Sequence, residues 1–289
     1  MKDMFICYNW FPMVADHIID LPDSFYKKHG ISRLHSCDNF DPKNVCEGDL
    51  IFVKTDFIVN GFFNKNILPL LNKKFSLITG ISSYQLGRDD ADAVKEILVN
   101  KNLNKLFCVH PPAIEDTKIV PLPIGFEEKE REGGNQNVIN FHYHMKKQFS
   151  LKKDKILLPY HTPNTNPERS NLINILSQLP FVEVQKEKLS FTDYLSLLDD
   201  YKFVICLEGS GPDLHRNYEA LLVDSIPINI KNVISKLFDY HGAPGVFLDS
   251  WDQLNKEKYE QILNFSYNRD NIDKFLHVEH HARLIRSLK

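Results

Sequence analysis

The sequence predicts an α/β protein built from two halves of comparable size. Along its 289 residues, short and continuously apolar runs alternate with helix-like segments. Runs of this kind are typical of parallel strands that helices cover on both faces. The stretch EEKEREGGNQN, residues 127–137, is charged and then rich in Gly and Asn, which favours a loop or a crossing between domains. The alternation restarts after it, so we expect one domain over residues 1–140 and a second over residues 141–289.

Each half is expected to hold five strands. The apolar runs of the first half lie at 4–10, 49–55, 74–80, 105–110 and 118–125, and those of the second half at 154–160, 181–185, 201–208, 225–230 and 245–249. Helices are expected near 64–72 and 89–100, and then at 166–179, 190–200 and 213–223. The tail from about residue 251 is expected to be helical and to pack back across the first half.

The segment 190–200 carries the clearest helical signal. Apolar and aromatic residues recur along it at helical spacing, at Phe191, Tyr194, Leu195 and Leu198. Ser190 and Asp193 stand three residues apart, which is the spacing of a capping box. We therefore expect a helix over 190–200 that begins at Ser190.

Composition and charge exclude several classes of function. Lys and Arg number 35 and Asp and Glu 38, so the net charge is −3 and no global field favours nucleic acid. No apolar run approaches the ~20 residues of a membrane span. The opening residues MKDMFICYNWFP lack the pattern of a secretory signal. The five cysteines are scattered, which favours buried thiols in a reducing compartment. We therefore expect a cytoplasmic protein.

The stretch KFVICLEGSGPDLHRNYEALLVDSIPINI, residues 202–230, concentrates the residues that carry chemistry. A buried strand is expected to end at Glu208 and to continue through Gly209, Ser210 and Gly211 into a helix capped by Asp213. Ligands of open α/β sheets gather at the carboxyl ends of the strands. A glycine-rich turn there lets backbone N–H groups approach a phosphate closely.

The helix that follows is expected to present His215, Arg216 and Glu219 on its polar side. A guanidinium there can hold a diphosphate, and a carboxylate one turn deeper can accept two hydrogen bonds from ribose hydroxyls. A purely structural interpretation competes with this one. It makes the segment a glycine turn and a cap, followed by a solvated helix face with an Arg/Glu pair at i,i+3 spacing. The residues by themselves leave both interpretations open.

The same stretch resembles the donor-binding signature of the exostosin-like glycosyltransferases of family 47. These enzymes have the GT-B fold, in which two Rossmann-like domains face each other. The resemblance spans roughly residues 75–250, includes VPLPIGFE (120–127) and LLPYHTPNTNPERSNLI (157–173), and is most specific over 201–230. There it rests on Gly209, Gly211, Asp213, His215, Arg216, Tyr218, Glu219, Ala220, Ile226 and Pro227. Many members carry a glycine where this chain has Asp224-Ser225.

This resemblance implies roles for individual residues. Arg169 and Arg216 would bind the diphosphate and Glu219 the ribose. The backbone around Gly209, Ser210 and Gly211 would lie near the phosphates or the transferred sugar, with a hydroxyl from Thr162 or Thr165. The implied reaction inverts the anomeric centre and needs no metal or other cofactor. It moves a sugar from a nucleotide-diphosphate sugar, with UDP as the usual nucleotide, to a hydroxyl of an oligosaccharide or glycoprotein glycan. A bacterial or viral source would suit this role.

The catalytic base is expected at the carboxyl end of a strand in the first half. Asp56 follows LIFVKT and His110 ends KLFCVH, so both qualify by position. Each also has a structural interpretation, Asp56 as a cap and His110 as a packed turn histidine. No metal site is predicted. The pair Asp90/Asp92 opens a helix and does not end an apolar strand, which favours helix N-terminal charge. The pairs His142/His144 and His280/His281 lack a third ligand at recognisable spacing. Two alternatives stay open: a GDP-sugar transferase similar to fucosyltransferases, and a nucleotide- or sugar-binding protein without catalysis.

Overall fold

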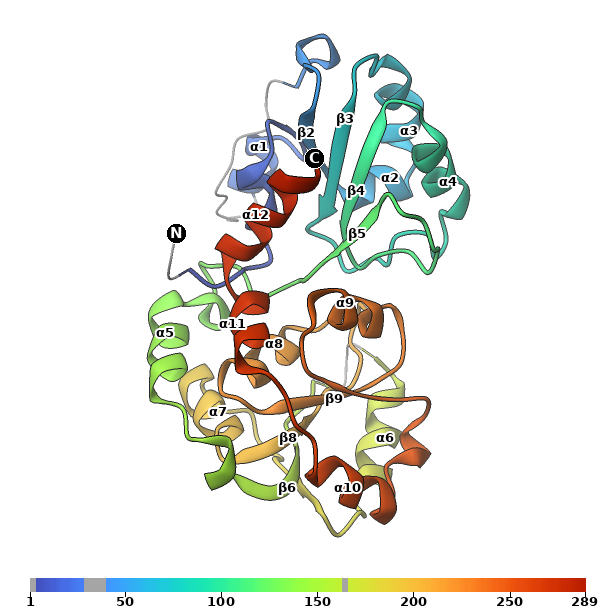
Figure 1. Cartoon of the computed structure of the whole chain (residues 1–289). Helices are drawn as coiled ribbons and strands as arrows, with labels where there is room; N and C mark the ends of the chain where they lie inside the picture. The colour runs from blue at the N-terminus through green and yellow to red at the C-terminus, as the bar shows by residue number, and fades with distance from the viewer. Residues whose placement is uncertain (1–3, 29–39, 163–165) are drawn as a thin grey trace. The chain divides into compact units, whose positions relative to one another are not determined.

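The computed structural model describes residues 4–28, 40–162 and 166–289, and the chain forms two compact units (Figure 1). The N-terminal unit consists of Ile6–Ile124 and Val278–Lys289, and the C-terminal unit of Met1–Phe5 and Gly125–His277. Each unit contains a five-stranded sheet whose strand pairs are all parallel. The predicted α/β class is confirmed. The segment 127–137 belongs to the C-terminal unit, and the last helix belongs with the residues of the first half.

The sheet of the N-terminal unit has its strands in chain order, β1-β2-β3-β4-β5. Side chains alternate along these strands, so residues such as Ile51, Val53 and Leu77 pack in one core cluster with Ile58 and Ile97. Figure 1 shows α2, α3 and α4 on one side of the sheet, and α1 and α12 on the other. The strands are β1 (His17–Ile19), β2 (Asp49–Lys54), β3 (Phe75–Gly80), β4 (Leu103–Val109) and β5 (Ile119–Leu122). The helices are α1 (Asp23–Lys28), α2 (Thr55–Val59), α3 (Phe62–Asn66), α4 (Ala91–Val99) and α12 (Val278–Leu288).

Two sequence predictions in this half need correction. The expected strand 4–10 is wrong: Phe5 makes only an isolated bridge, the chain turns at residues 8 and 9, and the 3₁₀ helix η1 (Phe11–Val14) follows. The predicted helix 64–72 is instead the short α3 followed by the 3₁₀ helix η3 (Leu68–Leu70). Pro69 explains this break, because proline has no N–H to continue an α-helical ladder.

The sheet of the C-terminal unit has the order β10-β9-β8-β6-β7. From β6 the chain adds β7 on one side, and it then returns past β6 to add β8, β9 and β10 on the other side. The direction of winding therefore reverses between β6 and β8, and such a reversal is where open α/β sheets bind ligands. The strands are β6 (Lys153–Leu158), β7 (Val182–Val184), β8 (Tyr201–Ile205), β9 (Ile226–Ile230) and β10 (Val246–Leu248).

Side chains alternate between the two faces of this sheet, and helices pack against the apolar side chains. Ile156 and Phe203 face a core cluster that includes Leu176 of α6 and Ile262 of α10. Figure 1 shows α6 and α10 together on one side of the unit, with α5 and α7 on the other. The helices are α5 (Gln136–Met145), α6 (Glu168–Leu176), α7 (Phe191–Leu198), α8 (His215–Leu222), α9 (Val233–His241), α10 (Lys256–Leu263) and α11 (Arg269–Leu276).

The predicted start of α7 is confirmed in detail. Ser190 is its N-cap residue, and the Ser190 hydroxyl accepts a hydrogen bond from the backbone N–H of Asp193 at 3.2 Å. The same hydroxyl donates to the Asp193 carboxylate at 2.7 Å. This cap satisfies a donor that the first turn of a helix leaves unpaired. It also fixes where α7 begins, at the edge of the sheet that carries the candidate site.

None of the helices in the described part of the chain combines the length and the apolar character that a bilayer crossing requires.

Candidate functional site

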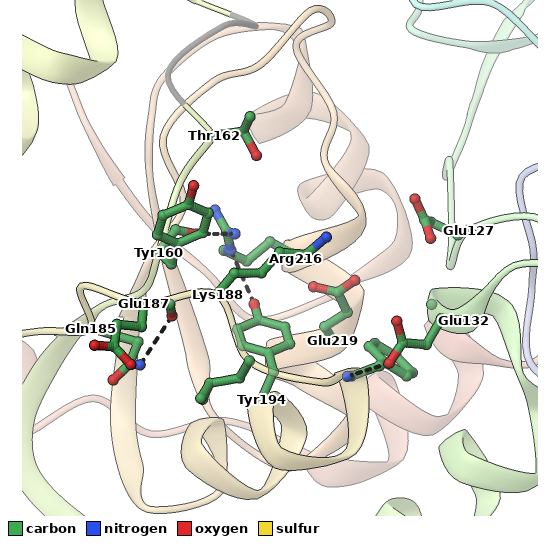
Figure 2. Close-up of a pocket in the computed structure, with 13 residues that line it drawn as sticks. Glu127, Glu132, Tyr160, Thr162, Gln185, Glu187, Lys188, Tyr194, Arg216 and Glu219 are labelled. Atoms are coloured by element: carbon green, nitrogen blue, oxygen red, sulfur yellow. Dashed lines mark hydrogen bonds between the residues drawn. The ribbon is translucent and has the colours of Figure 1, made fainter.

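A pocket of about 280 Å³ opens in the C-terminal unit at the carboxyl end of its sheet (Figure 2). Tyr160 and Thr162 reach it from the loop after β6, and Lys188 from the loop after β7. The helices α7 and α8 supply the remaining wall, with Tyr194 in α7 and Arg216 and Glu219 in α8. Glu127 and Glu132, from the segment after β5, close another side. The pocket therefore joins the loops that follow two neighbouring strands to the first turns of two helices.

Arg216 is the central cation of this pocket. Its Nε donates to the Tyr194 hydroxyl at 3.0 Å, and its Nη2 donates to the backbone carbonyl of Tyr160 at 2.9 Å, as Figure 2 shows. Within the described ranges, its Nη1 has no hydrogen-bond partner. Burial opposes the charge of the guanidinium, but Tyr194 and Glu219 outweigh it and raise the Arg216 pKa. The pocket therefore contains a fixed positive charge with donors available to an anion.

Glu219 lies one turn further along α8 and is 8% exposed. Burial raises its pKa, while the charge of Arg216, the charge of His215 and a hydrogen bond with Tyr194 act in the opposite direction. Glu127 adds a smaller upward contribution. The structure thus brings together Arg216 and Glu219, both predicted from sequence, at one pocket.

Arg169 lies at the start of α6 and is bonded to the protein itself. Its Nε donates to the carbonyl of Glu208 at 2.8 Å, its Nη2 to that of Leu207 at 2.9 Å, and its Nη1 to that of Thr162 at 3.2 Å. The side chain is only 7% exposed. Its guanidinium therefore holds the loop after β6 against the loop after β8, at the reversal of winding.

His161 is buried near both guanidinium groups. It is 4% exposed, its Nδ1 lies 2.6 Å from the carbonyl of Pro159, and its Nε2 accepts from the Leu207 N–H at 3.4 Å. An accepting Nε2 requires the proton to sit on Nδ1, so the ring is neutral. Burial, together with the charges of Arg216 and Arg169, lowers the His161 pKa to about 2. Because the His161 ring is neutral, the guanidinium groups of Arg169 and Arg216 lie near each other without a third positive charge beside them.

The glycine-rich turn after β8 has a packing requirement. A Cβ atom at Gly209 would lie 3.0 Å from Nη2 of Arg169 and 3.3 Å from Leu214. A side chain at this position would press on the guanidinium that reaches the carbonyls of the turn, and glycine avoids that contact. Ser210, which is exposed, and Gly211 continue the turn outside the residues that line the pocket. Thr162 lines the pocket, whereas Thr165 is outside the described residues.

Asp213 and His215 are engaged in contacts within the unit. The predicted cap at Asp213 is wrong: Leu214 is the N-cap of α8, and no side chain bonds there as a cap. Asp213 is buried and accepts from the Tyr218 hydroxyl at 2.5 Å and from the Asn217 side chain at 3.2 Å, so it ties the loop to α8. Nδ1 of His215 lies 2.7 Å from the carbonyl of Gly125, and this side chain does not line the pocket.

The departure at Asp224-Ser225 also has a local explanation. Asp224 has a φ of +59°, in the left-handed region that favours glycine but tolerates Asp. The Asp224 carboxylate pairs with Arg269, and the buried hydroxyl of Ser225 shares its one proton between the carbonyls of Leu198 and Tyr201, which lie 2.8 and 2.6 Å from its oxygen. An ion pair and a side-chain hydrogen bond therefore stabilise this turn. A glycine would adopt the same left-handed backbone conformation without them.

The two candidate bases belong to the N-terminal unit, at the carboxyl end of its sheet. Asp56 lies in the first turn of α2, and its carboxylate accepts from Nζ of Lys54 at 2.5 Å. His110 directly follows β4, is 1% exposed and has a φ of +54°. The strand β3 lies between the two strands that precede these residues. Their role as bases stays a prediction.

Several residues of the pocket were not predicted as site residues from sequence: Glu127, Glu132, Tyr160, Lys188 and Tyr194. Tyr160 and Lys188 follow the ends of β6 and β7, so their position in the sequence was an available signal. Tyr194 falls on the apolar stripe of α7, where its hydroxyl carries no periodic signal. Glu132 accepts from the backbone N–H of Phe191 at 2.7 Å, a contact between segments far apart in the chain.

The pocket can thus bind an anion at Arg216 and Lys188 while its carboxylates accept hydrogen bonds from hydroxyl groups. That combination suits a ligand with phosphate and sugar parts. No family model matches the chain, and no curated protein does either.

Proposed function

We propose that this protein is an inverting glycosyltransferase that uses a nucleotide-diphosphate sugar as donor. The observation that carries the proposal is the pairing of Arg216 with Glu219 in one pocket at the carboxyl end of a parallel sheet. The resemblance to exostosin-like enzymes supports the same function, and the finer assignment to the GT-B fold is part of the proposal.

In this account the diphosphate binds at Arg216. As the bond between the anomeric carbon and the diphosphate breaks, negative charge grows on the leaving oxygen. The free Nη1 of Arg216 and the ammonium of Lys188 would stabilise that charge without a metal ion. Glu219 would accept hydrogen bonds from the two ribose hydroxyls, so that the nucleoside and the phosphates lie side by side.

An acceptor hydroxyl must lose its proton as it attacks. Glu127 lines the pocket, and across the described ranges its carboxylate accepts no hydrogen bond, whereas Glu132 accepts one from the backbone N–H of Phe191. Glu127 therefore joins Asp56 and His110 as a candidate base. Direct attack on the anomeric carbon would invert its configuration in a single displacement.

The donor nucleotide is proposed to be UDP, with GDP as the alternative. Both present the diphosphate and the ribose hydroxyls that Arg216 and Glu219 would bind, so these two residues do not discriminate between them. The bases differ in size and in hydrogen-bonding edge, and a panel of sugars on each nucleotide separates the two donors.

The test is the release of nucleoside diphosphate from UDP- and GDP-sugars, with and without oligosaccharide acceptors. We expect release with one nucleotide class, stimulated by an acceptor. Arg216→Ala should reduce release by at least about a hundredfold, since removal of one donor to developing charge costs that much in other enzymes. The exposed Arg283→Ala is the matched control and should leave release unchanged. Binding without release or transfer would favour a non-catalytic binding protein.

A further inference from the structure

A second pocket, of about 360 Å³, opens in the C-terminal unit at the carboxyl ends of β9 and β10. Lys231 directly follows β9 and Asp249 directly follows β10, and both line this pocket. The 3₁₀ helix η7 (Trp251–Gln253) and the start of α10 supply the rest of the wall. The pocket at Arg216 uses the loops after β6 and β7, which lie toward the opposite edge of the sheet. The two pockets share no lining residue and are therefore separate.

The polar side chains of this second pocket hold one another in place. Nζ of Lys231 lies 2.8 Å from Oδ1 of Asp249. Gln253 bonds to Asp249 twice, because its Nε2 donates to Oδ2 at 3.0 Å and its Oε1 accepts from the backbone N–H at 2.9 Å. The hydrogen bonds from Lys231 and Gln253 lower the Asp249 pKa. The carboxylate is therefore ionised, and each of its oxygens has a lone pair left for a ligand hydroxyl.

Donor groups lie at the start of α10, near this carboxylate. Asn255 is the N-cap of α10, and its Oδ1 accepts from the backbone N–H of Lys258 at 3.0 Å, which leaves the Asn255 Nδ2 as a donor. The Lys258 ammonium is close enough to Asp249 to lower its pKa further. In the part of the chain that the structure describes, neither this ammonium nor the Asn255 Nδ2 has a hydrogen-bond partner. The pocket thus combines available donors with a fixed acceptor.

The aromatic ring of Phe247 lines the pocket among these polar groups. This ring and that of Phe238 make a T-shaped contact, with their centroids 5.3 Å apart. Gly245 leaves room for both rings, because a Cβ atom there would lie 2.9 Å from Cε2 of Phe247 and 3.1 Å from Cδ1 of Phe238. Phe238 is buried, whereas Phe247 is half-buried, so part of the Phe247 ring is accessible to a ligand.

We propose that this second pocket binds a neutral oligosaccharide. Two lysines and two carboxylates line it, Glu257 being the second carboxylate, so its charges cancel and favour neither an anion nor a cation. A sugar ring has an apolar C–H face that can pack on the negative face of an aromatic ring such as Phe247. Its hydroxyl groups both donate and accept, so they match Asp249 together with the donors of Asn255 and Lys258. This inference goes beyond the proposed function, since binding here needs neither a nucleotide nor a reaction.

The experiment is an NMR titration of the whole isotope-labelled chain with maltotriose, cellotriose, mannotriose, galactotriose and triacetylchitotriose. We expect at least one trisaccharide to shift the backbone amides of residues 247–258. Asp249→Ala should weaken that binding by roughly tenfold to a hundredfold, as loss of hydrogen bonds to a charged group implies. Phe247→Leu, which keeps an apolar side chain but removes the ring, should weaken it as well. The matched control is Asp252→Ala, which should bind as the wild type does, because Asp252 is exposed in the same loop but does not line the pocket.

Inorganic phosphate, UDP and GDP serve as further probes. A shift of the 247–258 amides with phosphate but with no trisaccharide would overturn the inference, because the pocket would then be an anion site. The inference also fails if no trisaccharide moves these amides, or if Asp249→Ala and Asp252→Ala bind equally well. UDP or GDP should shift amides near Arg216 and leave those of 247–258 unchanged. Absence of any shift with UDP and GDP would overturn the proposed function alone, and the trisaccharide result would still decide the second pocket.

Discussion

Arg169 donates from Nη2 to the carbonyl oxygen of Leu207 at 2.9 Å, which joins the first turn of α6 to the end of β8. Its other two hydrogen bonds end on the carbonyls of Glu208 and Thr162. The guanidinium therefore connects the loops on both sides of the point where the sheet reverses its winding. Because the loop after β6 lines the pocket, Arg169 also supports the pocket. This role is in addition to any contact with a phosphate that the family resemblance implies.

This arrangement predicts a loss of stability in Arg169→Ala. The change removes three hydrogen bonds to backbone carbonyls and opens space in a buried region, so we expect the free energy of unfolding to fall by about 3 kcal/mol. Urea unfolding checks this, with the exposed Arg283→Ala as control. Unchanged stability, with nucleotide binding alone lost, would mean that Arg169 serves only the ligand.

A second buried contact is the hydrogen bond between the Tyr218 hydroxyl and the Asp213 carboxylate, on the buried side of α8. Asp213→Asn weakens the bond to the Tyr218 hydroxyl, and we expect it to lower the free energy of unfolding by about 2 kcal/mol. Because the two residues share one bond, Tyr218→Phe should cost less in the Asp213→Asn background than in the wild type. Additive losses in the unfolding midpoints would show that the bond does not contribute.

His161 predicts how stability depends on pH. Its pKa is about 2 in the folded protein, well below the ordinary histidine value in the unfolded chain. Below about pH 6.5 the unfolded chain binds a proton that the folded protein does not bind, so stability falls as the pH falls, by up to ~1.4 kcal/mol per pH unit. Urea unfolding between pH 7 and pH 5 measures this slope. His161→Gln should flatten it and the exposed His144→Gln should not; an unaltered slope in His161→Gln would contradict a buried neutral ring.

If Glu127 is the catalytic base, changing it should impair sugar transfer without impairing nucleotide binding. In Glu127→Gln the amide keeps the shape of the side chain but cannot take a proton, so transfer should fall by roughly a hundredfold or more. The Kd of the nucleotide should change little, since Arg216 and Glu219 are intact. The control is Glu132→Gln, which changes another glutamate that lines the pocket. Full transfer activity in Glu127→Gln would return the base assignment to Asp56 or His110.

The sheets and most helices were predictable because their signals are local. The apolar runs at β2, β3, β6 and β8, and the Ser190 cap of α7, each depend on neighbouring residues in the chain. The apolar run at 4–10 failed for a related reason. Its residues Phe5 and Ile6 are buried as expected, but Phe5 is buried by packing against rings such as Phe126 and Tyr143 and not by pairing within a sheet. Periodicity reports burial and does not distinguish the two.

The site was predictable only in part. Arg216 and Glu219 follow from their spacing on α8 and from the strand that precedes them. Tyr194 does not, because its hydroxyl gains its role from Arg216, which lies 22 residues away in the sequence. Glu127 and Glu132 reach the pocket from a charged segment that sequence composition assigns to a loop. Contacts between distant segments determine these roles, and a single sequence does not display them.

The most direct measurement is a thermal-shift titration of the wild type and Arg216→Ala with UDP, GDP and their sugars, with and without Mg²⁺ or Mn²⁺. Ligand at 100 times its Kd stabilises a protein by ~2.7 kcal/mol, which gives a clear rise in Tm. We predict such a rise with UDP or GDP in the wild type, without a requirement for metal, and its loss in Arg216→Ala. No shift with any nucleotide, or an equal shift in both proteins, would contradict the assignment of this pocket to a nucleotide-diphosphate donor.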